Sequence, residues 1–297
     1  MKKIVLLLIS LAMVFGLCAC SGGSSDGSGK SGKVADDTSV MGMGFALPEN
    51  YETVERYCEF DREGNLIEKD ITYTLTDGKT LGYAYTPNSD LSELIDFSSM
   101  DSVEQGGKTC YFYPNGDDTY VFIPADTDFY AIPYTGPAEE LKEIIKSLSF
   151  TDAKETVTDD TGLGTLSYSF ENEDNIYSRS VRVSERKASG TIETKSVQYY
   201  FGENEDSQEY RIFLRQYRNR KIEDILDPER NYEEREINGI SYTAHISDNY
   251  DKPYNYYTQQ GNDVYQLANN GTSGLFTSRS EESFAAFEAF LNTVSFK

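Results

Sequence analysis

Residues 141–150 read LKEIIKSLSF, and residues 287–296 of the 297-residue chain read FEAFLNTVSF. Apolar side chains stand at the same spacing in both segments, and this spacing predicts an amphipathic helix that runs into a short strand. A pattern that recurs in this way indicates an internal repeat. We therefore treat the chain as two copies of one structural unit.

Three further pairs of segments match in the same order along the chain. The first pair has helical spacing, the second is a glycine turn that opens a strand, and the third alternates apolar and polar residues as β-hairpins do. The pairs are 91–96 with 222–227, 106–111 with 238–243, and 71–85 with 197–217. Four matches in one order predict a duplication of the whole unit.

The first forty residues have a composition of their own. Residues 4–17 are almost entirely apolar and follow two lysines, which is typical of a signal peptide and too short for a comfortable membrane span. The run ends in LCACS at 17–21, which resembles the lipobox of bacterial lipoproteins. The resemblance implies cleavage before Cys20, acylation of that cysteine by lipid such as palmitate, and a location on the extracytoplasmic face of the cell membrane.

These patterns predict an α+β fold with two repeated modules, each an antiparallel sheet packed with helices. The expected divisions are a signal peptide at 1–19, a lipidated cysteine and flexible Gly/Ser tether at 20–39, module 1 at 40–151, a linker at 152–163 and module 2 at 164–297. This element order resembles the photosystem-P and Mog-like α/β/α sandwich modules found in many bacterial lipoproteins of unknown role. The resemblance implies no catalytic residues.

The charge of the chain restricts its partners. Fifty Asp and Glu residues outnumber 27 Lys and Arg residues, which gives a net charge of -23. Such a surface repels nucleic acid and anionic lipid, so we expect no nucleic-acid partner. Neutral or cationic ligands are favoured over polyanions.

Cysteine chemistry leaves two alternatives open. Once Cys18 leaves with the signal peptide and Cys20 is acylated, Cys58 and Cys110 remain, both on predicted strands of module 1. Export permits a disulfide between them, worth about 4 kcal/mol in the chain-entropy model. The alternative is two thiols that act as small apolar side chains. Tyr242 occupies the position of Cys110 in the second copy, which favours the alternative.

The sequence predicts no metal site, no cofactor and no catalytic centre. His245 is the only histidine, and we expect it to be a strand residue because one imidazole cannot build a usual zinc site without further ligands. The run YDKPYNYY at 250–257 is the most unusual composition in the chain. Its tyrosines could form an exposed binding surface, with Tyr250, Tyr254, Tyr256 and Tyr257 as its members, or alternate between core and solvent on a strand pair.

A basic island covers residues 211–221. On a strand, Arg211 and Arg215 share one face with Phe213 and Tyr217, so this face could contact an anion or a partner. In so acidic a chain, pairing of the arginines with nearby carboxylates is the favoured interpretation.

Together these features predict a membrane-tethered, extracytoplasmic lipoprotein that acts as a non-catalytic binding or assembly module for a protein, peptide or glycan. A substrate-capture lipoprotein of a transporter is the alternative, and a hydrolase is a weaker one. A transporter lipoprotein would favour alternating strands and helices, whereas this repeat is richer in consecutive strands.

The lipid anchor can be tested directly. We expect radiolabelled palmitate to label the wild-type chain and not the Cys20→Ala chain, because the thiol of Cys20 is the predicted acylation site. The matched control is Cys18→Ala, which should still be labelled. Label that persists on Cys20→Ala would contradict the prediction.

Overall fold

The computed structural model describes residues 38–89, 95–247, 249–271 and 279–297. The chain forms two compact units. The described part of unit 1 lies within 38–57, 67–157 and 186–191, and that of unit 2 within 58–66, 158–185 and 192–297. The predicted signal peptide and Cys20 fall outside the described residues.

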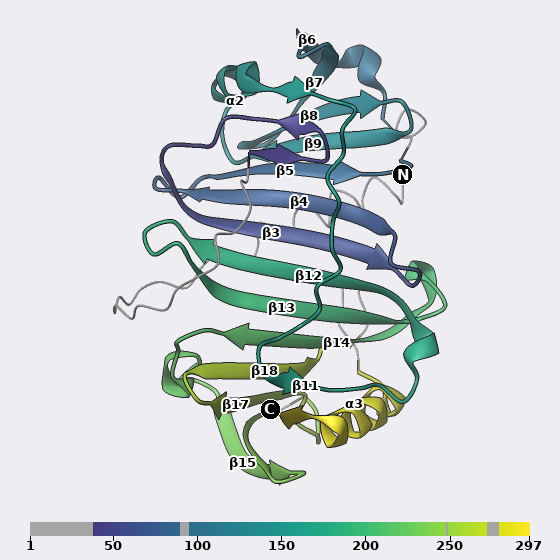
Figure 1. The fold of residues 1–297 in the computed structure, drawn as a ribbon, viewed down its shortest axis with the longest axis vertical. Coiled ribbons are helices and arrows are strands. Elements are labelled where there is room, and N and C mark those ends of the chain that lie inside the picture. Colours follow the sequence, from purple (N-terminus) through teal and green to yellow (C-terminus); the bar gives the residue numbers. More distant parts are fainter. Residues whose placement is uncertain (1–37, 90–94, 248, 272–278) are drawn as a thin grey trace. The chain divides into compact units, whose positions relative to one another are not determined.

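Unit 1 is built on a row of antiparallel strands in the order β3-β4-β5-β9-β8-β7-β6 (Figure 1). The strands are β3 Tyr51–Asp61, β4 Leu66–Leu75, β5 Thr80–Thr86, β6 Asp101–Gln105, β7 Lys108–Asn115, β8 Asp118–Ala125 and β9 Asp128–Tyr134. Short turns join β3 to β4, β4 to β5, β6 to β7, β7 to β8 and β8 to β9, and Gly78 and Gly116 supply the positive φ that two of these turns require.

Unit 2 repeats this arrangement with the strand order β12-β13-β14-β18-β17-β16-β15. The strands are β12 Ile176–Arg186, β13 Thr191–Gly202, β14 Gln208–Tyr217, β15 Asn231–Ile237, β16 Ile240–Ile246, β17 Asn255–Gln260 and β18 Asp263–Asn269. Numbered from the start of each unit, the two orders are identical. The matched hairpins at 71–85 and 197–217 become β4-β5 and β13-β14.

The matched segments that close each copy also correspond. In unit 1, α2 Ala138–Ile144 leads through a 3-10 turn to β10 Ser149–Phe150, which joins β1 Ser39–Val40 and β2 Met43–Gly44 in a small sheet. In unit 2, α3 Glu281–Thr293 leads to β19 Ser295–Phe296, which pairs with β11 Leu166–Ser167. The 3-10 helices are η1 Phe97–Ser99, η2 Ile145–Ser147, η3 Glu173–Asn175, η4 Glu205–Ser207 and η5 Ile222–Asp224.

The core of unit 2 lies between one face of its sheet and helix α3. Ser280 caps the helix by accepting a hydrogen bond from the backbone N–H of Ser283, and Glu281 and Glu282 complement the helix dipole. The apolar stripe of the helix packs on alternate residues of the strands. Its buried members include Phe287, Phe290 and Leu291, which face strand residues such as Val197, Ile212, Leu214, Tyr256 and Leu267.

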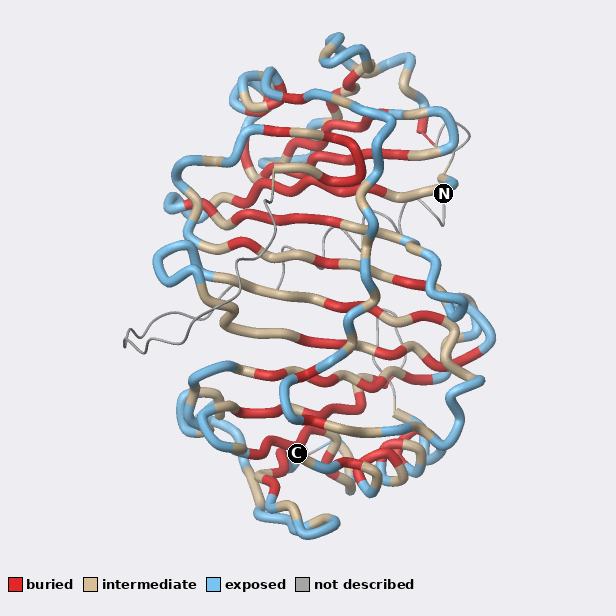
Figure 2. The backbone as a smooth tube through the Cα atoms, in the orientation of Figure 1, coloured by how far each residue is buried: buried red, intermediate tan, exposed pale blue. Residues whose placement is uncertain are grey.

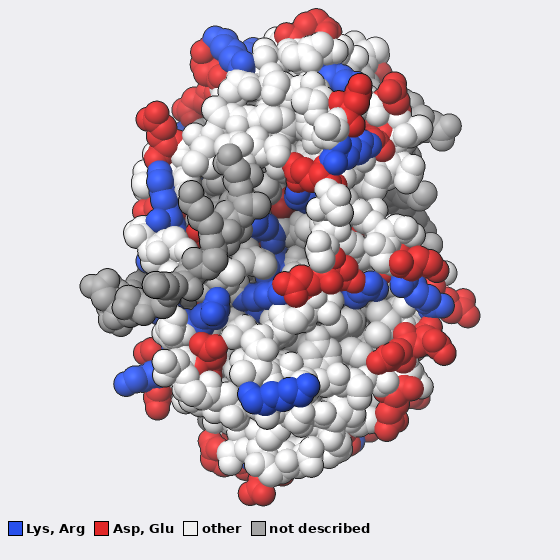
Figure 3. Space-filling view, in the orientation of Figure 1, with Lys and Arg blue, Asp and Glu red and all other residues white. Residues whose placement is uncertain are grey.

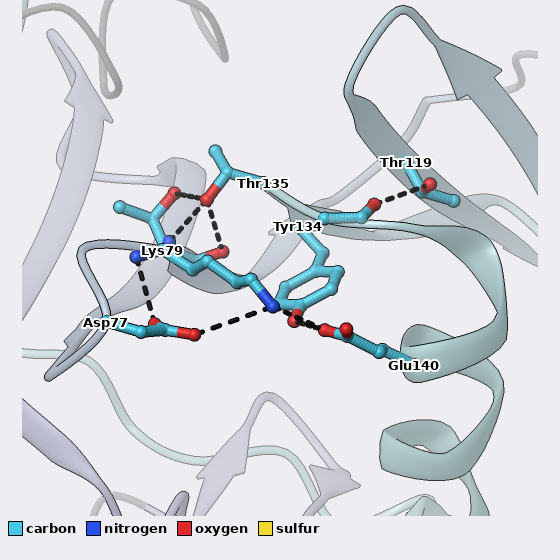
Figure 4. Close-up of polar contacts among 8 residues, drawn as sticks. Asp77, Lys79, Thr119, Tyr134, Thr135 and Glu140 are labelled. Atoms are coloured by element: carbon cyan, nitrogen blue, oxygen red, sulfur yellow. Dashed lines mark hydrogen bonds and ion pairs between the residues drawn. The ribbon is translucent and has the colours of Figure 1, made fainter.

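In unit 1, polar contacts fasten helix α2 to the strands (Figure 4). Glu140 on the helix accepts hydrogen bonds from Lys79 Nζ, at 2.6 Å, and from the hydroxyl of Tyr134 on β9. Just after β10, Lys154 binds Asp128 and donates to the hydroxyl of Tyr85 at 2.8 Å. These contacts fix the helix and the chain that follows it to unit 1.

The other face of the unit 1 sheet is covered by the chain itself. Ile95, Phe97 and Met100 pack on an apolar cluster that includes Ala84 and Ala131. The rings of Phe97 and Tyr111 lie 4.7 Å apart. This part of the sheet therefore has apolar contacts on both faces.

The expected α+β class, with helices packed on each sheet, is wrong. The described residues are mostly strand, and only two α-helices occur among them, of seven and thirteen residues. The helical spacing at 222–227 gives only the 3-10 turn η5, and most of 91–96 lies outside the described residues. Strands of up to twelve residues supply most of the core, so the fold is predominantly antiparallel β.

Buried tyrosines make the stability of the fold sensitive to alkali. Burial raises the pKa of Tyr130 and of Tyr210 to about 12, and also raises that of Tyr83 and Tyr242. An unfolded tyrosine ionises near pH 10, so the stability that these phenols contribute is complete below about pH 10 and is lost between about pH 10 and 12. Each phenol removes at most about 1.4 kcal/mol per pH unit in that window, and solvent screening reduces this figure for Tyr130 and Tyr210.

The measurement is urea unfolding followed by circular dichroism at several pH values between about 8 and 11. The midpoint should fall as the pH passes 10, together with the appearance of tyrosinate absorbance. A midpoint that does not change over this range would show that these tyrosines ionise equally in both states.

Candidate functional site

Buried and half-buried residues alternate along strand β14, so its side chains point alternately to the two faces of the unit 2 sheet. Figure 2 colours the chain by burial in the orientation of Figure 1. Ile212 and Leu214 enter the core against α3, whereas Arg211, Phe213, Arg215 and Tyr217 are half-buried on the opposite face. The sequence predicted this shared face, and the structure confirms it. We call this side of the unit 2 sheet the open face.

The register of the neighbouring strands defines what surrounds Arg215. On β13 it pairs with Ser196, and on β18 it pairs with Gln266. Gln266 in turn pairs with Tyr257 on β17. Directly paired residues of antiparallel strands point to the same face, so these side chains form one row across the open face.

Two aromatic rings on the same strand hold the guanidinium of Arg215. Its carbon Cζ lies 4.8 Å from the ring centre of Phe213 and 5.6 Å from that of Tyr217. Nη1 donates a hydrogen bond of 3.3 Å to the hydroxyl of Tyr217. Stacking on aromatic faces is favourable for a guanidinium and restricts its orientation.

A chain of hydrogen bonds extends from this pair along the open face. The hydroxyl of Tyr217 donates to Oε1 of Gln266 at 3.0 Å, and Nε2 of Gln266 donates to Oδ1 of Asn255 at 3.0 Å. Nδ2 of Asn255 donates to the hydroxyl of Tyr257 at 2.9 Å. The row thus has fixed donors and acceptors beside a cation held by aromatic rings.

The charge of Arg215 has no counterion within the described part of the chain. Carboxylates are spread over the surface that Figure 3 draws, yet none of the ion pairs between described residues includes Arg215. Its Nε is buried and makes no hydrogen bond with any described residue. A buried N–H without a partner costs about 1–3 kcal/mol of stability. An acceptor supplied by a ligand would therefore bind favourably at this position.

The expectation that carboxylates neutralise the basic island is therefore not met at Arg215. Arg220 does pair with Glu193 at 3.5 Å, as expected. Arg211 donates to the backbone carbonyls of Asn270 and Gly271, and its burial lowers the pKa of its guanidinium.

The duplication provides an internal comparison for the row. Thr243, Tyr257, Gln266 and Arg215 lie in register across unit 2. The corresponding row of unit 1 is Tyr111, Phe122, Ala131 and Ala84. In unit 1 these positions are small or aromatic and are covered by Ile95, Phe97 and Met100, so the fold itself does not require a charged network there.

The predicted four-tyrosine surface does not form. Tyr256 packs on Phe287 in the core, with ring centres 5.8 Å apart, whereas its strand neighbour Tyr257 lies on the open face and is only 8% exposed. Tyr250 and Tyr254 are half-buried, and the guanidinium of Arg279 lies 3.7 Å from the ring centre of Tyr254. Strand alternation separates the members of the run, as the second interpretation of the sequence expected.

His245 lies on β16, as the sequence predicted, and is 8% exposed. Its ring centre lies 5.7 Å from that of Tyr232 and 5.6 Å from that of Tyr254. Among the described residues, no group of three or more His, Cys, Asp or Glu side chains could hold a metal ion.

Within residues 38–89, 95–247, 249–271 and 279–297, no helix has both the length and the apolar character that a membrane span requires.

Neither Cys58 nor Cys110 forms a disulfide in the structure. Cys58 lies on β3 and is half-buried, and Cys110 lies on β7 and is fully buried. Burial, with a smaller contribution from Glu104, raises the pKa of the Cys110 thiol to about 11. The structure thus has both as thiols, and whether they are bridged in the exported protein stays a prediction.

Sequence reasoning did not find the polar partners of Arg215. Asn255 and Tyr257 belong to the tyrosine-rich run, and Gln266 lies in a plain alternating strand. Only the pairing of β17 with β18, and of β18 with β14, brings them beside the arginine. Aligning the two copies would have given a signal, because Arg215 occupies the position of an alanine.

Comparisons with known proteins add little to this geometry. No family model matches the chain, and no curated protein matches it. Two similar solved structures are the crystal structure of MucB in complex with MucA(peri) and the complex structure of Pseudomonas aeruginosa MucA/MucB. Both are 7% identical in sequence to this chain, and each match covers 83% of this chain. The matches cover 94% and 93% of the two solved chains, and the TM-scores are 0.18 and 0.17.

Similarity at that level supports no conclusion about fold or partner. The resemblance of the modules to photosystem-P and Mog-like sandwiches stays a prediction.

The two thiols can be distinguished by alkylation. Under native conditions near neutral pH we expect Cys58 to react faster than Cys110, because Cys110 is 0% exposed and its raised pKa leaves little thiolate. Under denaturing, non-reducing conditions both should react, as read by mass spectrometry. Two cysteines that resist alkylation in the denatured chain would indicate a disulfide instead.

Proposed function

We propose that this chain is a lipoprotein anchored through Cys20 on the extracytoplasmic face of the membrane, and that it binds a protein, peptide or glycan without chemistry of its own. The lipobox-like LCACS and the Gly/Ser-rich stretch after it support the anchor and the tether. A flexible tether would let the folded units search the space above the membrane.

The observation that carries the binding function is Arg215 on the open face. Its guanidinium is held between two rings and beside a hydrogen-bonded row, yet no described carboxylate neutralises it. Such groups fix the orientation of a ligand at little further entropic cost, since they are ordered before it arrives.

The chemistry of the row favours binding over turnover. An arginine remains protonated at all accessible pH values and cannot act as a general base. The amides of Gln266 and Asn255 donate and accept hydrogen bonds but transfer no proton near neutral pH. Tyr257 keeps its proton as well, because burial raises the pKa of its phenol.

Site-specific cross-linking on intact cells tests the proposed function. A photo-cross-linking residue replaces Gln198, which is half-buried beside Phe213 on the open face. We expect one reproducible adduct, and we expect Arg215→Gln in the same chain to reduce its yield about tenfold, as loss of a charged hydrogen bond does.

The matched control places the same photo-cross-linking residue at Asp117, in an exposed turn of unit 1. It should not give that adduct. The proposal fails if both positions give the same products, or if Gln198 gives none.

A further inference from the structure

We infer that the ligand of the open face is a peptide that presents a single carboxylate to Arg215 and is otherwise neutral or basic. This inference rests on the proposed function and assigns its ligand class. Two questions decide it: which group would pair with the guanidinium, and which class of molecule would carry that group.

The guanidinium requires an anion with two oxygens in one plane. Arginine presents N–H donors in a planar fork, and carboxylate oxygens accept two of them side by side. Nη1 already donates to the hydroxyl of Tyr217, whereas the buried Nε makes no hydrogen bond with any residue that the structure describes. A carboxylate would therefore satisfy a donor that the free protein leaves unpaired.

The immediate surroundings of Arg215 do not oppose a carboxylate. The residues that pair with it, Ser196 and Gln266, are uncharged, and so are Phe213 and Tyr217 on its own strand. The acidic residue of the same row is Glu234 on β15, which accepts a hydrogen bond of 2.9 Å from Thr243. Strands β16, β17 and β18 lie between β15 and β14. At about 4.8 Å per strand, Glu234 lies roughly 19 Å from β14.

The whole chain, however, opposes a ligand with many negative charges. With a net charge of -23, long-range repulsion would act against nucleic acid, acidic polysaccharide or an anionic membrane. A neutral or basic molecule with one carboxylate can pair with Arg215 and is not repelled by the negative charge of the chain. A peptide meets this condition, because its remaining residues can be uncharged or cationic.

The rest of the row matches what a peptide offers beside its carboxylate. Gln266 is half-buried and presents an amide group of the kind that pairs with a peptide backbone, and the buried Asn255 holds that amide in place through a hydrogen bond of 3.0 Å. Phe213 and Tyr217 present half-buried rings that can cover apolar side chains. In unit 1 the chain's own Phe97 and Met100 cover the corresponding positions, which shows that an apolar segment fits this face of the repeated unit.

Affinity selection with the full-length mature lipoprotein in detergent tests the inference. Three pools of short, N-acetylated peptides of neutral and basic residues are compared. One ends in a free carboxylate, one is amidated and contains a single glutamate, and one is amidated and has no acidic residue. We expect at least one carboxylate pool to be retained about tenfold better than the pool that has none. The two carboxylate pools show whether a chain terminus or a side chain supplies the group.

Two substitutions and a control connect the retention to Arg215. Arg215→Gln removes the charge and Arg215→Lys keeps it without the planar fork, so both should lose the preference for carboxylate. Arg218→Gln removes the same charge from an exposed neighbour and should leave the preference intact. Circular dichroism melting of each variant verifies that it folds.

Each remaining result counts against the inference. Equal retention of all three pools, no retention of any pool, or an Arg215→Gln protein that behaves like Arg218→Gln would overturn it. If cross-linking from Gln198 still succeeds in that case, the binding function stands and only the ligand class is wrong. If cross-linking fails too, both proposals fall.

Discussion

The two-residue alternation of antiparallel strands is the constraint on which unit 2 depends. Successive side chains of β14 point to opposite faces. Ile212 and Leu214 therefore pack in the core with α3, while Phe213 and Arg215 lie on the open face. The core therefore uses only every second residue. The intervening positions can carry charge and hydrogen-bonding groups without disturbing the packing against the helix.

Comparison of the two copies shows that a whole face of the sheet, and not only single positions, can differ in polarity. Unit 1 shows that the repeated sheet can be completed with Ala84, Ala131 and Phe122 under a segment of its own chain. In unit 2 the same row carries Arg215, Gln266 and Tyr257. One copy thus uses the face for stability, and the other carries a polar network around a cation that no described carboxylate neutralises.

Much of the strand architecture could be predicted from the sequence, because hairpin patterns and glycine turns are local signals. The matched segments 141–150 and 287–296 do occupy equivalent places as α2-β10 and α3-β19. The fold class could not be predicted in the same way. A short apolar spacing such as that of 222–227 fits a helix, but a stable helix needs more turns than η5 contains.

The candidate site was predictable only along one strand. Arg211, Phe213, Arg215 and Tyr217 share a face by simple alternation, which the sequence shows directly. Their partners come from β17 and β18, about forty to fifty residues away, and depend on strand pairing that no local pattern encodes. That no carboxylate in the described part of the chain pairs with Arg215 is likewise a property of the folded arrangement.

The arginines of β14 also bear on how the chain selects its pairing while it folds. If β14 slipped by one residue against β13 and β18, Arg211 and Arg215 would enter the space under α3, and Ile212 and Leu214 would face outward. A charge buried there without a partner would cost several kcal/mol. The group proposed to recognise a ligand therefore also penalises the misregistered sheet, so that specificity in folding and specificity in binding depend on the same side chains.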